Sequence, residues 1–405
     1  MTTPPSQSKP LTIAIVSDLH CCTSLDGSRK SFLTAGSKRT PIGQHLVQAL
    51  LALIEKNKLV ADAVICPGDL AHQVCAAGMI QAWDHLGEIQ RKLKSPMLLP
   101  TIGNHDVDSR KLIGPDPFDI PKTIHPEFPR PDSNDKDMFW NRGFYHAKIS
   151  DRASFIVLNT VIKHNDHASA ERGTFANSYI EDMQKYLESE YHEKGNGSPP
   201  LRIGVMHHHP IVHSTAHFGS PDSLEFGDQL LDVLGDYGFQ FIVHGHRHEP
   251  RITRHRSRSL AQLIFAAGAF SAQLGELASR TKNLFHHIDL ESEGSQYGIT
   301  GRIRTWEFTF GVGWQEASEQ SARIPYESAL ASPEPQIVID DLIQQCDQSP
   351  GGVMRLADIQ QHCPQLLRIL PSELAAHIAF LQSRGYKLIR DDQGQIIQIG
   401  KVFPP

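Results

Sequence analysis

The segment LTIAIVSDLH, residues 11–20, is an apolar run that ends in two side chains able to bind a metal ion. The part Leu11–Val16 has the pattern of a buried strand. Asp18 and His20 stand two residues apart directly after it, so both side chains can turn to one face. Because open α/β sheets carry their active sites at the carboxyl ends of strands, this segment predicts both a sheet and a site at its edge.

Four further segments repeat this arrangement later in the chain. The strand-like runs are Ala63–Cys66, Met97–Ile102, Leu201–Met206 and Phe239–Val243, followed in turn by Gly68-Asp69, Gly103-Asn104-His105-Asp106, His207-His208-His209-Pro210 and Gly245-His246-Arg247-His248. Carboxylates, one amide and several imidazoles form a ligand set that suits two adjacent divalent ions. One such motif is weak evidence, whereas five in this order indicate an enzyme with a two-metal site.

Single motifs have plainer explanations. An Asp-x-His triplet such as Asp18-Leu19-His20 is common by chance. Gly68 permits a tight turn that leaves both oxygens of Asp69 available, but Gly-Asn at 103–104 is also an ordinary turn signal, with Asn104 as a capping residue. The prediction therefore depends on the whole set of motifs.

The order and spacing of the five motifs resemble the calcineurin-like metallophosphoesterase family, whose pattern reads D-x-H, GD, GNH(D/E), H and GHxH. The resemblance covers roughly residues 11–310, and every motif is intact. Within the family, GNHD and a histidine-rich HHP segment before GHxH are most similar to the cyclic-nucleotide phosphodiesterase-like branch. The resemblance implies a four-layer α/β/β/α sandwich and hydrolysis of a phosphate ester by water activated on two metal ions.

For the metals, the resemblance implies two ligand sets that share one aspartate. The first is Asp18, His20, Asp69 and His248, and the second is Asp69, Asn104, His207 and His246. A shared carboxylate keeps two ions about 3.5–4 Å apart. Matching the family pattern without a gap selects His207, which we expect, whereas counting back from Pro210 selects His208. The identity of the two metals stays open among Mn²⁺, Fe²⁺ or Fe³⁺, and Zn²⁺, because ligands of these types bind all of them.

His105 is the expected catalytic residue, since it neighbours a ligand and the family does not use it as one. It would protonate the leaving oxygen, while Asp106 would hold the other ring nitrogen and raise the basicity of the ring. The alternative role for His105 is a hydrogen-bond donor behind the ligands. Asn104, His105 and Arg247 are the expected substrate-binding residues.

The composition is that of a globular protein. The chain has 405 residues, of which 40% are hydrophobic and 21% charged, and its formal net charge is −6. That charge argues against general attraction to nucleic acid or anionic membranes. We find no membrane-length apolar run, no apolar core of a signal peptide and no CxxC spacing among the six cysteines. We therefore expect a cytoplasmic protein with reduced thiols and no membrane contact.

Alternating strand and helix patterns predict an α/β fold of two mixed sheets flanked by helices. The expected helices are Gln44–Lys58, Ala77–Leu93, Asn177–Glu190 and Leu224–Asp236, and the expected further strands are Phe144–Ile149, Ser154–Asn159 and a run of hairpins from Leu263 to Phe310. Residues 108–140 are rich in Pro and Asp with little periodicity, so we expect a long loop over the rim of the site.

The C-terminal part of the chain has a different pattern. We expect a disordered N-terminus at 1–10, the metallophosphoesterase domain at 11–315, a linker at 316–335 and a small domain at 336–405. The small domain has predicted helices Gln336–Gln345, Val353–Cys363 and Ser372–Arg384, then a hairpin of Tyr386–Arg390 and Gln395–Ile399. This order is similar to a winged-helix module, which often binds DNA, although the last helix has few basic residues and a protein partner fits equally well.

Two classes of function follow. The first is a dinuclear metal-dependent phosphodiesterase acting on a nucleotide-type ester, with a nuclease guided to DNA or RNA by the C-terminal module as its main variant. The second is a non-catalytic binding or regulatory protein that keeps the fold as a scaffold. The second class is disfavoured because no expected ligand position is lost.

Overall fold

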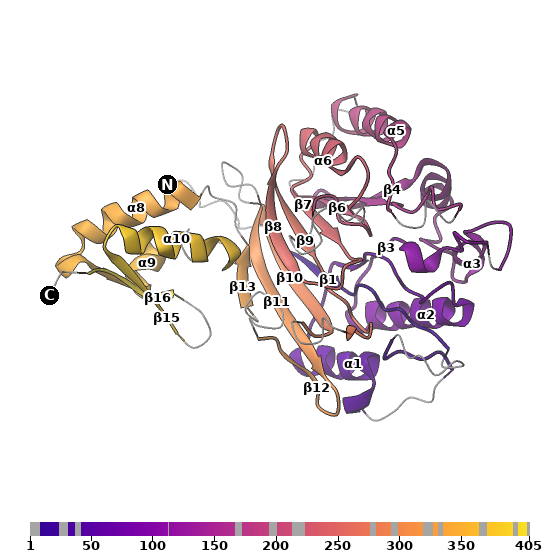
Figure 1. The fold of residues 1–405 in the computed structure, drawn as a ribbon, viewed down its shortest axis with the longest axis horizontal. Coiled ribbons are helices and arrows are strands. Elements are labelled where there is room, and N and C mark those ends of the chain that lie inside the picture. The colour runs from indigo at the N-terminus through magenta and orange to yellow at the C-terminus, as the bar shows by residue number, and fades with distance from the viewer. Residues whose placement is uncertain are drawn as a thin grey trace.

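Two large β-sheets pack face to face, with helices on the outside, and a small C-terminal unit lies beside them (Figure 1). The computed structural model describes residues 9–23, 31–36, 42–111, 113–166, 172–193, 201–212, 223–275, 281–292, 299–318, 327–330, 335–363, 371–391 and 396–402. The expected disorder of residues 1–10 therefore falls mostly outside the described residues.

The first sheet contains the strands that lead into the first three motifs. Its strands are β1 (Leu11–Ile15), β2 (Ala63–Cys66), β3 (Leu98–Pro100), β10 (Leu284–Ser292), β11 (Ile299–Thr309), β12 (Gly313–Glu316) and β13 (Glu327–Leu330). The order is β12-β11-β10-β1-β2-β3, with β13 also paired to β11. β1, β2 and β3 are parallel, whereas β10 pairs antiparallel with β1 and β11. The sheet is therefore mixed.

The second sheet contains the strands that lead into the last two motifs. Its strands are β4 (Phe144–Ile149), β5 (Ala153–Leu158), β6 (Leu201–Val205), β7 (Phe241–His244), β8 (Arg251–Arg256) and β9 (Ala261–Ala266). The order is β4-β5-β6-β7-β9-β8, parallel from β5 to β9 and antiparallel at both edges. The inner strands β5 and β7 are buried along their whole length because both of their faces are covered.

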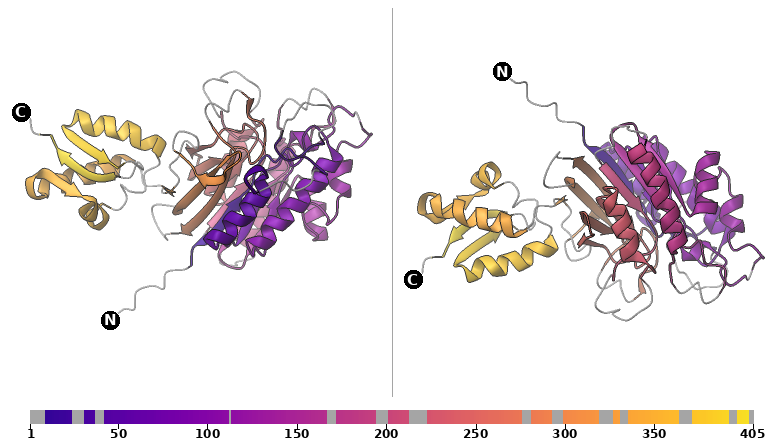
Figure 2. Two further views of the ribbon diagram at one scale, coloured as in Figure 1. Left: turned by 90° about the horizontal axis from the view of Figure 1, so that it is seen from below. Right: turned by 90° about the horizontal axis from the view of Figure 1, so that it is seen from above.

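Amphipathic helices cover the outer face of each sheet (Figure 2). They are α1 (Leu46–Asn57) and α2 (Ala76–Lys92) by the first sheet and α5 (Asn177–Glu188) and α6 (Gly227–Asp236) by the second. α1 buries Leu46, Leu50 and Leu53, spaced three and four residues apart along one stripe. The expected four-layer α/β/β/α sandwich is confirmed.

The expected loop at 108–140 contains short helical segments. They are α3 (Asp119–Thr123), α4 (Ser133–Asp137) and the π-helical turn η3 (Met138–Arg142). Phe128 and Phe139 are fully buried, and the indole nitrogen of Trp83 donates to the carbonyl of Pro126 at 2.7 Å. Aromatic burial against α2, which a periodicity argument does not detect, therefore orders this segment.

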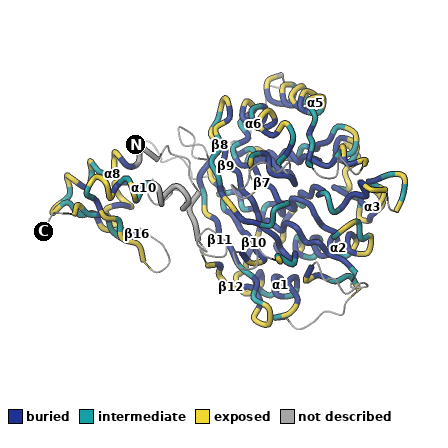
Figure 3. The backbone as a smooth tube through the Cα atoms, in the orientation of Figure 1, coloured by how far each residue is buried: buried dark blue, intermediate teal, exposed yellow. Residues whose placement is uncertain are grey.

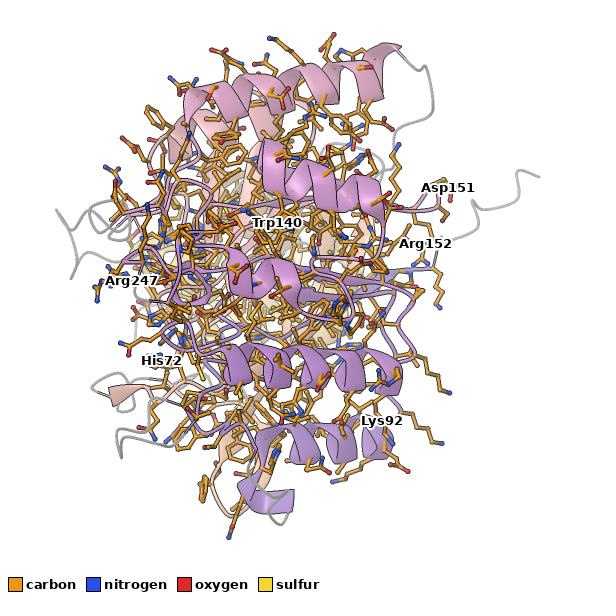
Figure 4. The ribbon with its side chains drawn as sticks, turned by 90° about the vertical axis from the view of Figure 1, so that its right-hand side faces the viewer. His72, Lys92, Trp140, Asp151, Arg152 and Arg247 are labelled. Atoms are coloured by element: carbon orange, nitrogen blue, oxygen red, sulfur yellow. The ribbon has the colours of Figure 1, made fainter. Side chains whose placement is uncertain are left out.

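The strands place all five motifs at one edge of the sandwich. In the side view, His72 and Arg247 lie on one side of the molecule, and Lys92 and Arg152 lie on the opposite side (Figure 4). Buried residues concentrate in the two sheets (Figure 3). No helix in the part of the chain that the structure describes is both long and apolar enough to cross a membrane.

The C-terminal unit has its own buried cluster, which includes Ile339, Leu342, Met354 and Ile399. Its elements are α8 (Pro335–Gln348), the turn η8 (Pro350–Gly352), β14 (Val353–Arg355), α9 (Leu356–His362), α10 (Pro371–Ser383), β15 (Tyr386–Arg390) and β16 (Ile396–Lys401), with the sheet order β14-β16-β15. Three helices and a hairpin are present as expected, but their identification as a winged helix stays a prediction.

Two sequence-based expectations about this region need correction. The helix expected at Val353–Cys363 begins only at Leu356, because Val353 and Met354 instead pair with Gly400 and Ile399 of β16. The expected linker at 316–335 contains β13, which pairs with β11, while residues 319–326 and 331–334 lie outside the described residues. The division of the chain into domains stays a prediction.

Candidate metal centre

Hydrogen bonds donated by backbone amides connect four of the five motif loops beyond the strand ends. The amides of Asp18 and His20 donate to the carbonyls of Gly68 and Asp69 at 3.2 and 2.9 Å. Gly245 likewise donates to the carbonyl of His207 at 3.1 Å. The amide of His246 donates to Asp18 Oδ1 at 3.1 Å, which connects the motifs of one sheet to those of the other.

A first cluster of donors consists of Asp18, His20, Asp69 and His248. One donor atom from each lies within 4.8 Å of the others. His20 Nε2 is 2.9 Å from His248 Nε2 and 3.4 Å from Asp69 Oδ2, and His248 Nε2 is 3.5 Å from Asp18 Oδ1. These are the four residues expected around the first metal.

A second cluster surrounds Asn104, which belongs to the short turn η2 (Asn104–Asp106). Asn104 Oδ1 lies 3.1 Å from His207 Nε2 and 3.1 Å from His246 Nδ1. His207 Nε2 is also 3.4 Å from Asp69 Oδ2. The four residues expected around the second metal therefore converge as well, and the same oxygen of Asp69 faces both clusters.

The ring of His207 has a defined tautomer. Its Nδ1 lies 2.9 Å from the carbonyl oxygen of Pro67, which can only accept, so Nδ1 must carry the proton. The lone pair of Nε2 then faces Asn104 and Asp69, as a metal-binding imidazole requires. The neighbouring His208 turns its Nδ1 to Thr160 Oγ1 at 2.9 Å. The orientation of the His207 ring therefore supports His207 as a ligand.

Several of these residues have left-handed backbone conformations, which are rare outside glycine. The φ angles are 53° at Asp18, 46° at His20, 53° at Asp69, 79° at His246 and 55° at His248. Backbone strain of this kind collects at functional sites, where the surrounding structure maintains it. Space is equally constrained, because a Cβ atom at Gly103 would lie 2.1 Å from Asp69 Oδ1. Only glycine fits there.

Burial and neighbouring charges shift the pKa values of the carboxylates of Asp69 and Asp18. Burial, followed by the charges of Asp106 and Asp18, raises the pKa of Asp69 well above its usual range. Burial also raises the pKa of Asp18, but the hydrogen bond and charge of His248 outweigh it and leave the pKa lowered. Burial lowers the pKa of His20 and of His207, which favours the neutral rings whose lone pairs can bind a metal ion. Bound cations would compensate the negative charge.

The role expected for Asp106 is wrong in this structure. Its carboxylate accepts from the backbone amides of Leu70 at 3.2 Å, Ala71 at 2.7 Å and Gly103 at 2.9 Å. The amide of Gln73 donates to Nδ1 of His105 at 3.3 Å. Asp106 therefore joins two motif loops, and its carboxylate accepts from these amides instead of holding the ring of His105.

The surroundings of His105 lower its pKa, whereas an increase in basicity was expected. Burial, followed by the nearby His72 and other imidazoles, lowers the pKa of His105 to about 3. The ring is therefore neutral at physiological pH. Because Nδ1 accepts from Gln73, its proton is on Nε2. His105 can thus donate a hydrogen bond from Nε2.

No pattern in the sequence singled out His72, which the structure places at the site. Its ring stacks on His105 with centroids 4.8 Å apart, and its Nδ1 is 3.5 Å from Nδ1 of His20. The available signal was its position three residues after Asp69, in the loop that follows a ligand. Arg247, expected to bind substrate, is partly buried between His246 and His248, and burial lowers its pKa.

The donors present fit two divalent cations. Both clusters combine carboxylate or amide oxygens with imidazole nitrogens, and they share Asp69. Such mixed sets bind Mn²⁺, Fe²⁺ and Zn²⁺ alike, so they do not select one metal.

Comparison with known proteins identifies the class. The family model "Calcineurin-like phosphoesterase" matches residues 11–250, and the chain belongs to this family. It is a calcineurin-like metallophosphoesterase with a His/Asp cluster that fits a dinuclear metal site. Membership supports a metal-dependent phosphoester hydrolase. No curated protein matches the chain in sequence.

Solved structures show more distant likenesses. A purple acid phosphatase from seeds of yellow lupin (Lupinus luteus) is 14% identical, with a TM-score of 0.48, and the match covers 77% of this chain but 54% of that one. PhoD is 9% identical over 82% of this chain and 73% of that one, with a TM-score of 0.43. TT1561 of Thermus thermophilus is 9% identical over 74% and 100%, with a TM-score of 0.37. The chain thus spans about half of the lupin enzyme.

Proposed function

We propose that this protein is a dinuclear metal-dependent phosphodiesterase that hydrolyses a nucleotide-type phosphate ester. The observation that carries the proposal is the position of Asp69 Oδ2. It lies 3.4 Å from His20 Nε2 in one donor cluster and 3.4 Å from His207 Nε2 in the other. One carboxylate oxygen facing two donor clusters is the arrangement that holds two ions at the spacing for phosphoryl transfer.

The proposed first set of ligands is Asp18, His20, Asp69 and His248, and the second is Asp69, Asn104, His207 and His246. Two bound divalent ions would neutralise the charge of the phosphate and lower the pKa of a water molecule bound to them to about 7. Nε2–H of His105 would donate a hydrogen bond to the leaving oxygen. Asn104 and Arg247 would contact the phosphoryl group, and Asp106 would hold the loops in register.

A nucleotide-type substrate is supported by the HHP segment at 208–210 placed before GHxH, as in the cyclic-nucleotide branch that the sequence resembles. A nuclease is the main alternative, because the C-terminal unit has the order of elements seen in modules that often bind DNA. In that case the tail, not the metal centre, would supply affinity for nucleic acid.

The test is a hydrolysis panel in the presence of Mn²⁺. Its substrates are bis-p-nitrophenyl phosphate, p-nitrophenyl phosphate, cyclic AMP and single-stranded DNA. Wild type is compared with Asp69→Ala and His105→Ala, and with Asp84→Asn, an exposed change on α2, as the matched control. Diester cleavage by wild type and the control, lost in Asp69→Ala, supports the proposal. Cleavage of DNA but not cyclic AMP selects the nuclease.

Two negative results have different meanings. If wild type binds two metal ions but cleaves none of the four substrates, the substrate class is wrong and the metal centre stands. If wild type binds no metal and its rates equal those of Asp69→Ala, the enzyme proposal fails and a scaffold role replaces it. Metal content measured on the same samples separates the two results.

A further inference from the structure

We propose that His208 is an additional imidazole ligand of the second metal ion, beside His207 and His246. This inference rests on the proposed dinuclear site and adds a residue that the family pattern does not assign. It would give the second ion three imidazoles, whereas the first ion has two, from His20 and His248. The two positions would then differ in which metal ion each prefers to bind.

The first observation is the convergence of three rings. One ring nitrogen from each of His207, His208 and His246 lies within 4.8 Å of the other two. The ring centroid of His208 is 4.6 Å from that of His246 and 5.0 Å from that of His207. An unprotonated imidazole has a nitrogen lone pair that can bind a metal ion. Three such rings in one buried cluster can therefore bind a divalent ion among them.

The second observation is the partner of the other ring nitrogen. His208 Nδ1 lies 2.9 Å from Thr160 Oγ1. A metal-binding histidine almost always engages its non-ligating nitrogen with an oxygen acceptor, which fixes the tautomer and aims the lone pair. His207 engages the carbonyl oxygen of Pro67 in this way, and His208 can engage the hydroxyl oxygen of Thr160. When Nδ1–H donates to Thr160, the lone pair is on Nε2.

The third observation is the space made for this ring. His208 is 1% exposed, and a Cβ atom at Gly173 would lie 2.2 Å from its Cγ atom. The fold therefore maintains a buried imidazole beside two expected ligands and excludes a side chain at Gly173.

A third imidazole has a chemical consequence. Imidazole ligands suit Zn²⁺, Fe²⁺, Co²⁺ and Ni²⁺, whereas carboxylate and carbonyl oxygens suit Mg²⁺ and Mn²⁺. Each set has two oxygen donors, from Asp18 and Asp69 in the first and from Asp69 and Asn104 in the second, so the third nitrogen from His208 is the difference between them. We therefore expect the second position to prefer Zn²⁺ over Mn²⁺ more strongly than the first position does.

The test is Zn²⁺ binding by the full chain, measured by competition with a chromophoric chelator. The variants are His208→Gln, Thr160→Val and Thr160→Ser, with His164→Gln as control, since His164 is a buried neighbour 5.6 Å from the His208 ring but outside the cluster. We expect His208→Gln to weaken one of two Zn²⁺ sites by about 10–100-fold and Thr160→Val to weaken it by a smaller factor, with Thr160→Ser and the control like wild type. Thermal melting of each variant without metal checks that it is folded.

A direct readout is NMR of ring nitrogens in isotope-labelled protein loaded with Cd²⁺. The ring-nitrogen signal that disappears in His208→Gln is that of His208. In the wild-type spectrum this signal should be split by coupling to cadmium. Two Zn²⁺ bound with unchanged affinity in His208→Gln, together with no coupling, would overturn the inference and leave the proposed function intact. Wild type that binds no second ion would overturn both. Loss of activity in His208→Gln with unchanged Zn²⁺ affinity would assign His208 to substrate contact and reject it as a ligand.

Discussion

Asp69 accepts a hydrogen bond through Oδ1 from the backbone N–H of His105 at 2.9 Å. Its other oxygen faces both donor clusters, 3.4 Å from His20 Nε2 and from His207 Nε2. The residue expected to bridge the metals therefore also fixes the loop that carries the expected proton donor. Loss of this carboxylate should disturb metal binding and catalysis together.

Replacing Asp69 with Asn should weaken the binding of both metal ions while nearly preserving the shape of the site. The amide of Asn can still accept from His105 N–H, but it lacks the negative charge that two cations need. We expect diester hydrolysis to fall by at least about 100-fold and bound metal to fall below that of wild type. Elemental analysis and a rate assay on the same preparation test this. Unchanged metal content would contradict the bridging role.

His105→Ala should affect poor leaving groups most. An alkoxide needs a hydrogen bond or a proton from Nε2, whereas p-nitrophenolate leaves without one, so kcat should fall by roughly 100-fold or more only for alkyl esters. The comparison is kcat for an alkyl and a p-nitrophenyl diester in wild type and variant. Equal losses for both esters would show that His105 acts on metal binding or folding instead.

Asp106→Asn should destabilise the fold more than it alters the chemistry. Its two oxygens satisfy three buried amides, of Leu70, Ala71 and Gly103, and an Asn amide group cannot replace both oxygens as acceptors. We expect unfolding free energy to drop by about 1–3 kcal/mol, measured by urea denaturation. Asp84→Asn, exposed on α2, should change it little. A stable variant with altered leaving-group dependence would restore the orienting role for Asp106.

Asp62 and Arg152 form an ion pair at the edge of the sandwich opposite the site (Figure 4). Arg152 donates to both oxygens of Asp62, at 3.1 and 2.9 Å, and Thr12 N–H donates at 2.9 Å. Burial raises the pKa of Asp62, but these hydrogen bonds outweigh it and leave the pKa below its ordinary value of 3.8. The folded state therefore favours the ionised form.

This lowered pKa sets the pH at which the pair contributes to stability. The contribution is fully present above the unfolded pKa and is lost as the pH falls through the lower folded pKa. Asp62→Asn should cost about 1 kcal/mol at neutral pH, a modest value because solvent screens a partly exposed pair. Unfolding free energies of wild type and variant, measured by urea titration, should converge as the pH falls below the lowered folded pKa of Asp62. A difference that persists in acid would show that packing, not charge, is responsible.

Metal removal should destabilise the protein. Asp18, Asp69 and Asp106 are buried close together, and the charges of Asp18 and Asp106 raise the pKa of Asp69, so cations relieve an unfavourable arrangement. A ligand at 100 times its Kd stabilises the folded state by about 2.7 kcal/mol. We expect Tm to fall after chelation and to recover with Mn²⁺ in wild type but not in Asp69→Asn. Equal recovery in both would place the metal elsewhere.

The sequence alone predicted much of the fold and the set of side chains that converge at the candidate metal centre. Apolar runs followed by metal-binding side chains located β1, β2, β3, β6 and β7 and the residues at their ends. This works because strands bury continuous apolar segments, and parallel strands bring their carboxyl ends to one edge. Local patterns also located the four outer helices, whose apolar stripes repeat at helical spacing.

Tertiary structure alone decided which neighbours each of these side chains meets. The sequence places Asp106 beside His105, but the fold brings three amides from two loops to its carboxylate. Local patterns did not single out His72, and did not show that His208 would converge with His207 and His246. Hydrogen bonding and pKa depend on distance through space and on burial, and neither follows from position along the chain. The motifs therefore determined which residues form the site, and packing determined what each can do there.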